Sequence, residues 1–416
     1  MIELVKNIDE IIYDDFVSKH QGTIYQSSNW ARVKNNWDSQ RIAVYEDGQL
    51  IGTALILFKS IPMTPFKLAY MPRGPVCDYR NLDHFKQVLQ ACVDVAKEHR
   101  AFTLKFDPQI ARDAGQEIKD YVTSIGGKHG GYDKGIVYSQ PNFLMITELD
   151  EEEEVLFDRF DSKVRNLIRK GNQAGVHVHL GKLEDVEDFA KLMEITAQRD
   201  DFGMRDASYF KRLLTVLDVD AQLYLIKLNV EESMQAKLEE QAEIEKELQS
   251  LQDKLEPIKD EPVKKAKKLR NQIDQIQARM NKSQTIIADL QDCLEKGQSE
   301  VLLSGAIMAT FGDTAYYMYA ASSNDFRDVM PNYRLLWELM TDAIDEGCSY
   351  FDFGGVSGYT SENNQEDPLR GLYDFKKNFA SEMFETIGEF DLVIMPTINK
   401  IFETAMGLRK SLRDRK

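Results

Sequence analysis

The chain has 416 residues, of which 43% are hydrophobic, and it carries a formal net charge of −17. This length is sufficient for two or three domains with sizeable cores, and the composition is that of a globular protein rather than a disordered one. The negative charge argues against non-specific adhesion of the whole molecule to nucleic acid or anionic lipid, although a local basic face would still suit a polyanionic partner.

Cysteine usage and hydropathy indicate the cellular setting. The four cysteines lie far apart and form no CxxC pair, so neither a zinc cluster nor a disulfide framework is indicated. No window approaches eighteen consecutive apolar residues, and the acidic N-terminus lacks the apolar stretch of a secretory signal. We therefore expect a cytoplasmic protein without a transmembrane helix.

The first part of the chain, to about residue 147, alternates between strand and helix. Its predicted elements are a strand hairpin over 41–60 with its turn at Asp47-Gly48, a strand over 67–76, an amphipathic helix over 81–99 and a strand over 101–109. The segment 150–175 then predicts one helix, because acidic residues open it, basic residues close it and glycine follows.

The middle of the chain has a different composition. From about Glu231 to Lys296 it loses nearly all aromatic residues and glycine, and apolar residues recur at steps of three and four in two arms. Pro257 and Pro262 lie at the break between the arms, where a continuous helix would not accommodate them. We predict an antiparallel coiled-coil hairpin about 40–50 Å long, inserted between two strands. It would either reach a partner or form a solvated arm without one.

The second half of the chain repeats the order of the first. A strand over 314–323, a helix over 330–347 and a strand over 349–355 follow the hairpin, and both halves carry Phe-Asp near the end of the last strand, as Phe106-Asp107 and Phe351-Asp352. This repetition predicts a duplicated α/β domain. No nucleotide-binding glycine motif is met, and His177 and His179 have no third ligand tied to them by spacing, so we expect no cofactor and no metal site.

Several short segments resemble motifs of the Fem family of peptidoglycan bridge-forming aminoacyl transferases, and together they span nearly the whole chain. In order they are YQSSNWARVK (25–34), YMPRGPV (70–76), FDP (106–108), KVRNLIRKGNQAGV (163–176), TAQRDDFGMRDASYF (196–210), YAASS (319–323), YFDFGGVSG (350–358), GLYDFKKNF (371–379) and IGEFD (387–391). The resemblance implies two GNAT-like domains: residues 1–147, joined by the C-terminal segment 387–416, and residues 148–386, with the hairpin at 231–296 inserted in the second.

The resemblance also implies a reaction and its partners. An amine of the peptidoglycan stem peptide, or of a growing cross-bridge, would attack the ester of an aminoacyl-tRNA. The acceptor would be a muramyl pentapeptide precursor, either lipid II or a UDP-linked form. The basic tail at 406–416 would contact the inner face of the plasma membrane or remain a solvated terminus.

The family's site residues can be carried over to positions in this chain. Lys376 would stabilise the oxyanion of the reaction, with Lys377 as a less favoured substitute, and Phe375 would bind substrate as an aromatic wall beside it. Asp107 lies where the family is proposed to transfer a proton, although an aspartate at a strand end is also a common turn residue. Residues that would bind the acceptor are Lys34, Arg205, Tyr209 and Tyr319. If helical, Arg205 and Tyr209 would share one helix face.

Two other functions are compatible with the sequence. An acyl-CoA-dependent N-acyltransferase could have the same fold, with a thioester in place of the aminoacyl ester. A non-catalytic scaffold could use the coiled coil to recruit partners. Lys376 itself could also be an ordinary cation on a helix face.

Overall fold

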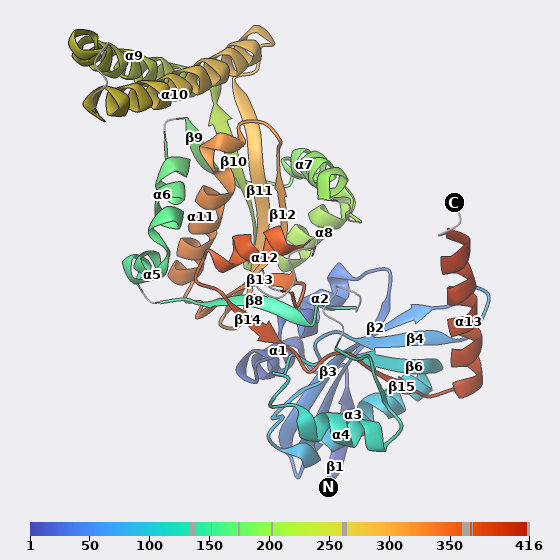
Figure 1. Ribbon diagram of the computed structural model, residues 1–416. Coiled ribbons are helices and arrows are strands. Elements are labelled where there is room, and N and C mark those ends of the chain that lie inside the picture. The colour runs from blue at the N-terminus through green and yellow to red at the C-terminus, as the bar shows by residue number, and fades with distance from the viewer. Residues whose placement is uncertain are drawn as a thin grey trace.

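The computed structural model describes residues 1–132, 139–150, 152–173, 175–200, 203–259, 264–359, 367 and 369–413, and only the backbone of 407–413. Two mixed α/β halves, each built on its own sheet, lie against one another, and a helical hairpin projects from the second (Figure 1). The predicted mixed α/β fold is confirmed. None of the helices in the described ranges is both long and apolar enough to span a membrane.

The first sheet contains eight of the described strands, and its helices cover both faces. Along the sheet the order is β1 (Ile2–Lys6), β2 (Asp38–Glu46), β3 (Gln49–Ser60), β4 (Lys67–Met71), β6 (Ala101–Phe106), β15 (Phe390–Val393) and β7 (Lys128–His129), with β5 (Val76–Cys77) paired to β3. The associated helices are α1 (Glu10–Lys19), α2 (Ser28–Val33), α3 (Leu82–Glu98), α4 (Gln116–Ser124) and α13 (Pro396–Arg413). The predicted hairpin turn is present: Asp47 and Gly48 both have positive φ, as a type I′ turn requires.

The second sheet contains seven of the described strands. Their order is β14 (Glu382–Glu385), β8 (Phe143–Glu148), β13 (Tyr350–Val356), β12 (Thr314–Ser322), β11 (Glu300–Phe311), β10 (Ala221–Asn229) and β9 (Val176–Gly181). Its helices are α5 (Glu153–Arg159), α6 (Ser162–Gly171), α7 (Val186–Asp200), α8 (Ala207–Leu217), α11 (Pro331–Asp345) and α12 (Arg370–Lys377). The predicted single helix over 150–175 is wrong, because Phe160 and Asp161 are extended and Phe160 turns into the core to pack against Trp337.

The two halves exchange a strand. In each half a helix connects two parallel strands, β4–α3–β6 in the first and β12–α11–β13 in the second. The first half ends with β7 and β8, and β8 crosses to the second sheet, between β13 and β14. The second half ends with β14 and β15, and β15 crosses back to lie between β6 and β7. The repeat seen in the sequence therefore corresponds to two sheets, each of which contains one strand from the end of the other half.

The exchanged strand spans the boundary expected from the sequence. The sequence predicts a boundary after residue 147, and the strand Phe143–Glu148, which contains that position, pairs with β13 and β14 in the second sheet. At the C-terminal end, β15 pairs with β6 of the first sheet, and Phe402 of α13 contacts Phe102 with ring centroids 4.9 Å apart.

A shared core holds the two halves together. Side chains from α1, α2 and β3 of the first half pack in one cluster with side chains from α7, α8 and β10 of the second. Separate clusters lie under α3 in the first half and under α11 in the second. The interface is therefore apolar and buried.

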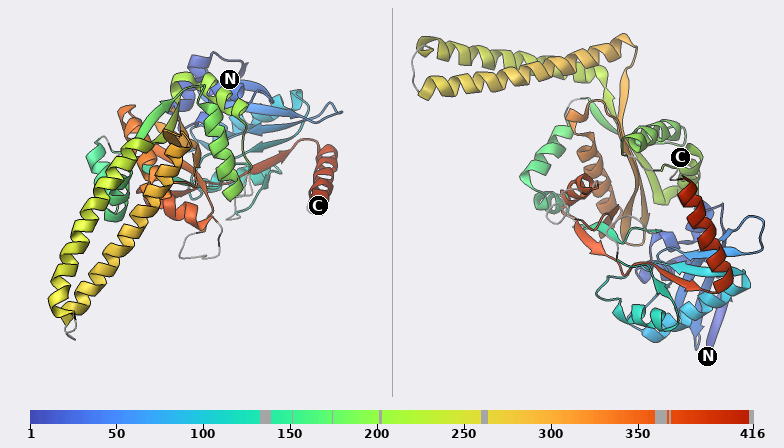
Figure 2. Two further views of the ribbon diagram at one scale, coloured as in Figure 1. Left: turned by 90° about the horizontal axis from the view of Figure 1, so that it is seen from above. Right: turned by 45° about the vertical axis from the view of Figure 1, so that its right-hand side comes forward.

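The helical hairpin consists of α9 (Val230–Leu255) and α10 (Lys264–Glu295), inserted between β10 and β11. The two helices run side by side away from the second sheet (Figure 2). Ile244, Ile276 and Met280 are buried between them. At the base, Leu290 belongs to the core of the second half, so only the distal part of the hairpin is independent of the domain. The break includes Pro257, and Pro262 lies outside the described residues.

Candidate active site between the two halves

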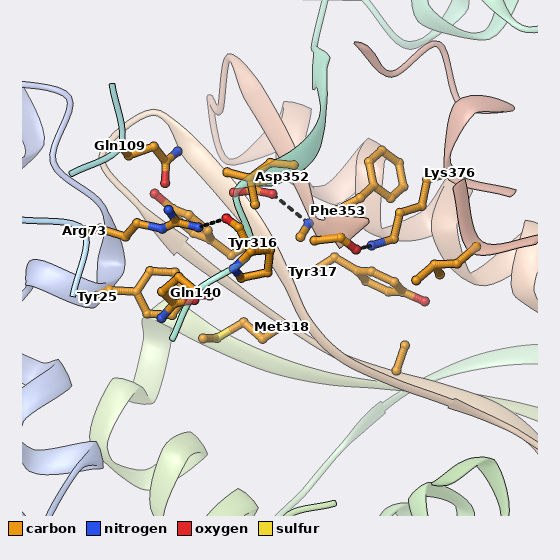
Figure 3. A pocket seen from close by; sticks show the side chains of 16 residues that line it. Tyr25, Arg73, Gln109, Gln140, Tyr316, Tyr317, Met318, Asp352, Phe353 and Lys376 are labelled. Carbon is orange, nitrogen blue, oxygen red and sulfur yellow. Dashed lines mark hydrogen bonds between the residues drawn. The ribbon is translucent and has the colours of Figure 1, made fainter. Parts of the chain in front are cut away.

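A cavity of about 290 Å³ lies where β12 and β13 separate. The parallel pairing of these strands runs from Thr314–Tyr350 to Tyr316–Asp352, after which the strands diverge. The cavity is lined by both strands and by α12, and from the first half by Tyr25, Arg73 and Gln109 (Figure 3). A ligand there would contact both halves.

Lys376 reaches this cavity from α12. Its side chain is 6% exposed, and its Nζ donates a hydrogen bond to the carbonyl oxygen of Gly355 at 2.8 Å. Burial lowers the pKa of Lys376 to about 8, and the nearby carboxylate of Asp352 acts in the opposite direction. Lys377, the substitute considered from the sequence, is exposed and lies over the ring of Tyr373 at 5.7 Å. Of these two lysines, Lys376 lines the cavity.

The glycine pair after β13's aspartate shapes the wall that Lys376 contacts. Gly354 has a φ of +75°, which a side chain would strain. A Cβ on Gly355 would lie 2.3 Å from Cγ of Pro141. The ladder between β13 and β8 is irregular here, between Asp352 and Gly355. The two glycines therefore allow the bend that presents the Gly355 carbonyl to Lys376.

Asp352 lines the same cavity from β13 (Figure 3). It is 5% exposed, and among the described residues its hydrogen-bond donor is the backbone N–H of Gly354, at 2.7 Å from Oδ1. Burial raises the pKa of Asp352, while the Gly354 N–H and the positive charges of Arg73 and Lys376 lower it.

Arg73 enters the cavity from the loop after β4. It is 2% exposed, with a φ of 54°, and its Nη2 donates to the carbonyl oxygen of Pro141 at 2.8 Å. Its Nε and Nη1 are buried and have no hydrogen-bond partner within the described ranges. A buried guanidinium with spare donors is an unusual arrangement, and it is suited to an anionic or carbonyl group of a ligand.

Asp107 lies close by but is enclosed. Its Oδ1 accepts the backbone N–H of Arg73 at 2.7 Å, and its Oδ2 accepts the hydroxyl of Tyr70 at 2.9 Å. Burial raises its pKa to about 6, against the lowering effect of Arg73. It is not among the residues that line the cavity. Its contacts hold the turn that carries Arg73.

The acceptor residues expected from the resemblance lie together in space. Lys34 Nζ lies 4.8 Å from the ring centroid of Trp30 and 5.5 Å from that of Tyr209. The guanidinium of Arg205 lies 5.2 Å from the Tyr209 centroid, and the hydroxyls of Tyr209 and Tyr319 are 2.9 Å apart. We call Lys34, Arg205, Tyr209, Arg212 and Tyr319 the cation–tyrosine cluster.

Arg212 was not expected from the sequence. Its guanidinium lies 5.5 Å from the Tyr209 ring, so three cations surround one phenol. Burial, together with the charges of Arg205 and Arg212, lowers the pKa of Lys34 to about 8. Trp30 links the cluster to the cavity: its ring lies under Lys34 Nζ of the cluster and contacts Tyr25 of the cavity wall, with ring centroids 4.9 Å apart.

Two details of the predicted site differ from the structure. Arg205 is not on a helix face with Tyr209, because α8 begins at Ala207 after its N-cap Asp206; Arg205 instead folds back over the Tyr209 ring. Phe375 does not line the cavity: on α12 it packs against Tyr333 and Phe379 in the core. The aromatic side chains beside Lys376 in the cavity wall are Tyr317 and Phe353.

Two sheets with a cavity between them, lined by Arg73 of the first half and by Asp352 and Lys376 of the second, define a two-domain α/β protein whose candidate site is built from both halves. A sequence profile of the FemAB family matches residues 8–406, and the chain belongs to that family.

Curated relatives and a solved structure agree with this membership. The chain is 35% identical over 404 residues to a lipid II:glycine glycyltransferase of Staphylococcus haemolyticus (strain JCSC1435), covering 95% of this chain and 94% of the relative. It is equally identical over 399 residues to the protein of that name from Staphylococcus aureus (strain MSSA476), covering 94% and 93%. The crystal structure of FemX aligns with a TM-score of 0.77 and 33% identity, over 96% of this chain and 100% of that one.

Proposed function

We propose that this protein transfers an amino acid from an aminoacyl-tRNA to the stem peptide of lipid II, at the inner face of the plasma membrane. Membership of the FemAB family and the names of its relatives support a transferase acting on a peptidoglycan precursor. Those names also make glycine the first amino acid to test. The basic side chains of the C-terminal tail from 407 on lie outside the described residues.

The cation–tyrosine cluster suits the pyrophosphate of the acceptor. Burial, together with the like charges of Arg205 and Arg212, lowers the pKa of Lys34. A bound anion would relieve this repulsion and favour the protonated lysine. The guanidinium of Arg205 can fork onto a phosphate, and the tyrosine hydroxyls can donate beside it. The stem peptide would then run past Tyr25 into the cavity.

The observation that carries the proposal is the buried Lys376 in a cavity next to this cluster. Aminolysis of an ester passes through a tetrahedral intermediate with a negatively charged oxygen. A buried ammonium group stabilises such an oxygen strongly, because little water screens the charge. Lys376 already donates to one carbonyl oxygen, that of Gly355, and can turn to another.

The test is transfer by the purified protein. Radiolabelled glycyl-tRNA and lipid II should yield a lipid II product heavier by one or more glycine residues, detected by mass spectrometry of the stem peptide. Seryl-tRNA and alanyl-tRNA serve as alternative donors, and UDP-muramyl pentapeptide serves as the alternative acceptor.

Two controls define the reaction. Free glycine with ATP should give no product, because the activated ester is the source of free energy for peptide-bond formation. Acyl-CoA should also fail as a donor. If no charged tRNA supports transfer to either acceptor, the proposed function is wrong; if acyl-CoA alone supports it, the protein is an N-acyltransferase of another kind.

A further inference from the structure

The repeated Phe-Asp pair places two buried aspartates in corresponding positions of the two halves. Asp107 follows β6, and Asp352 lies in β13, its counterpart in the second sheet. Both carboxylates lie within the electrostatic reach of Arg73. Their surroundings differ: both oxygens of Asp107 accept hydrogen bonds, from Arg73 and Tyr70, and Asp107 does not line the cavity.

Asp352 has the opposite character. Its neighbours Phe351 and Phe353 pack into the core of the second half, and alternation along the strand turns Asp352 to the other face, toward the first half. There it lines the 290 Å³ cavity and also a second cavity of about 460 Å³, which extends toward Thr23 and Glu148. Gln109, Tyr316 and Asp352 line both cavities. Asp352 thus lies where the two spaces adjoin.

We propose that Asp352 is the general base of the reaction, accepting the proton of the acceptor amine, with Asp107 as a positioning residue for Arg73. This assignment rests on the proposed function. The acceptor amine would enter from one cavity, and the ester carbonyl of the donor would lie between the Asp352 carboxylate and the Lys376 ammonium group, both of which line the cavity wall.

The proton balance of the step is complete. Asp352 takes a proton from the acceptor ammonium, and the neutral amine forms the new C–N bond at the ester carbonyl carbon. The carbonyl oxygen becomes an oxyanion beside the Lys376 ammonium. When the oxyanion collapses, the C–O bond of the ester breaks, and the leaving ribose oxygen receives the second proton of the amine nitrogen. The products are an amide, a free ribose hydroxyl and protonated Asp352, which loses its proton to water.

The groups that face Asp352 fit this role. They are Arg73 from the loop after β4, Lys376 from α12, Tyr316 from β12 and Tyr25 from the segment before α2. The two cations favour the carboxylate, while burial raises its pKa above that of a solvated aspartate, which makes it a stronger base. Burial and the Asp352 charge raise the pKa of both tyrosines, so they remain protonated.

The experiment compares Asp352→Asn with the unmodified protein in the glycyl-tRNA and lipid II assay. Asparagine keeps the size of the side chain and can still accept from Gly354. We expect kcat to fall by about 10²–10⁴-fold, as for loss of a general base, with the KM for lipid II changed by less than about threefold. The ratio of the kcat of the unmodified protein to that of Asp352→Asn should decrease as the pH rises from 6.5 to 9, because more of the acceptor amine is already neutral at the higher pH.

The direction of this pH effect separates base catalysis from a purely electrostatic role. If Asp352 only kept Lys376 protonated, its removal would lower the pKa of Lys376, and lowering the pH would restore activity. Recovery at low pH, or an unchanged kcat, would overturn the assignment. Failure of the unmodified protein to transfer would instead overturn the proposed function, and this assignment with it.

A second variant addresses misfolding. Asp352→Ala opens space for a small carboxylate. Added sodium formate should raise the kcat of this variant at least tenfold. Formate should not restore Asp107→Ala, because that side chain acts through the Arg73 turn. Equal rescue of both variants, or of neither, with folded protein confirmed by circular dichroism, would contradict the assignment.

Discussion

The Lys376 side chain, which ends in a titratable amine, lies in the cavity wall, and the residue is only 6% exposed. Moving an ammonium group out of water costs several kcal/mol, and its single described hydrogen bond, to Gly355, does not replace full solvation. The pKa of Lys376 is lowered to about 8 because of this desolvation. A position that destabilises the fold in this way is typical of a residue kept for chemistry.

Replacing Lys376 by methionine should separate catalysis from folding. We expect kcat to fall by about 10²–10³-fold, the usual loss for one oxyanion-stabilising donor, with little change in the KM for lipid II. The control is Lys377→Met, which removes an equal charge from the next position on the same helix but outside the cavity. Steady-state kinetics of both variants measure this, and equal effects of the two substitutions would rule out the special role of Lys376.

The stability of Lys376→Met should change with pH in a defined direction. Below about pH 8 the lysine is protonated in both the folded and unfolded states, so folding pays to bury a charge. Between pH 8 and 10.5 the unfolded state binds more protons, and the unmodified protein gains stability as pH rises. Methionine should therefore raise the unfolding midpoint most below pH 8, with the difference declining toward pH 10.

The chemistry of single residues was only partly predictable from the sequence. Lys376 and four members of the cation–tyrosine cluster were found through motifs, because a motif retains residue type and order; the fifth, Arg212, lies just beyond the quoted segment 196–210. Arg73 stands inside the quoted segment 70–76, but nothing in one sequence shows that its guanidinium is buried with free donors. Asp352 was visible as half of the repeated Phe-Asp pair, and only the folded structure shows that it, rather than Asp107, lines the cavity. Phe375 adjoins Lys376 in sequence, yet successive helical residues point about 100° apart.

At the scale of elements, the helical hairpin has two parts with different roles. The distal part buries Ile244, Ile276 and Met280 in a small cluster of its own. The base contributes Leu290, which is 1% exposed, to the core of the second half. The periodic apolar residues of the hairpin made its two helices predictable. The contact of Leu290 with the second half could not be predicted, because it depends on tertiary packing that periodicity does not encode.

Two deletions should therefore behave differently. Replacing residues 247–273 by a short glycine-rich turn should leave kcat with UDP-muramyl pentapeptide within about twofold, since the site lies far from the hairpin tip (Figure 1). Deleting 231–296 should lower the free energy of unfolding by about 2–5 kcal/mol or more, as for removal of a large buried apolar side chain. Kinetics and urea unfolding test both. Loss of turnover in the shorter deletion would show that the arm takes part in the reaction.

For the whole molecule, the strand exchange makes the two halves depend on each other. β15 lies inside the first sheet and β8 inside the second, so neither sheet is complete without a strand from the far end of the other half. The shared core of α1, α2, α7 and α8 adds apolar contact across the interface. The 290 Å³ cavity is lined by residues of both halves, so its walls depend on this interface.

This mutual dependence predicts unfolding in a single transition. Phe390 of β15 is fully buried and stacks on Phe106, so Phe390→Ala should cost about 3–5 kcal/mol. Tryptophan fluorescence can follow each half: Trp337→Phe leaves reporters in the first half alone, and the double substitution of Trp30 and Trp37 by phenylalanine leaves Trp337 in the second. In both backgrounds Phe390→Ala should lower the urea midpoint by the same amount, and Phe390→Leu, which retains most of the buried volume, by less. If the strand exchange couples the two sheets, the destabilisation caused at β15 must also lower the urea midpoint reported by Trp337. A shift confined to the first-half reporters would mean that the sheets unfold separately.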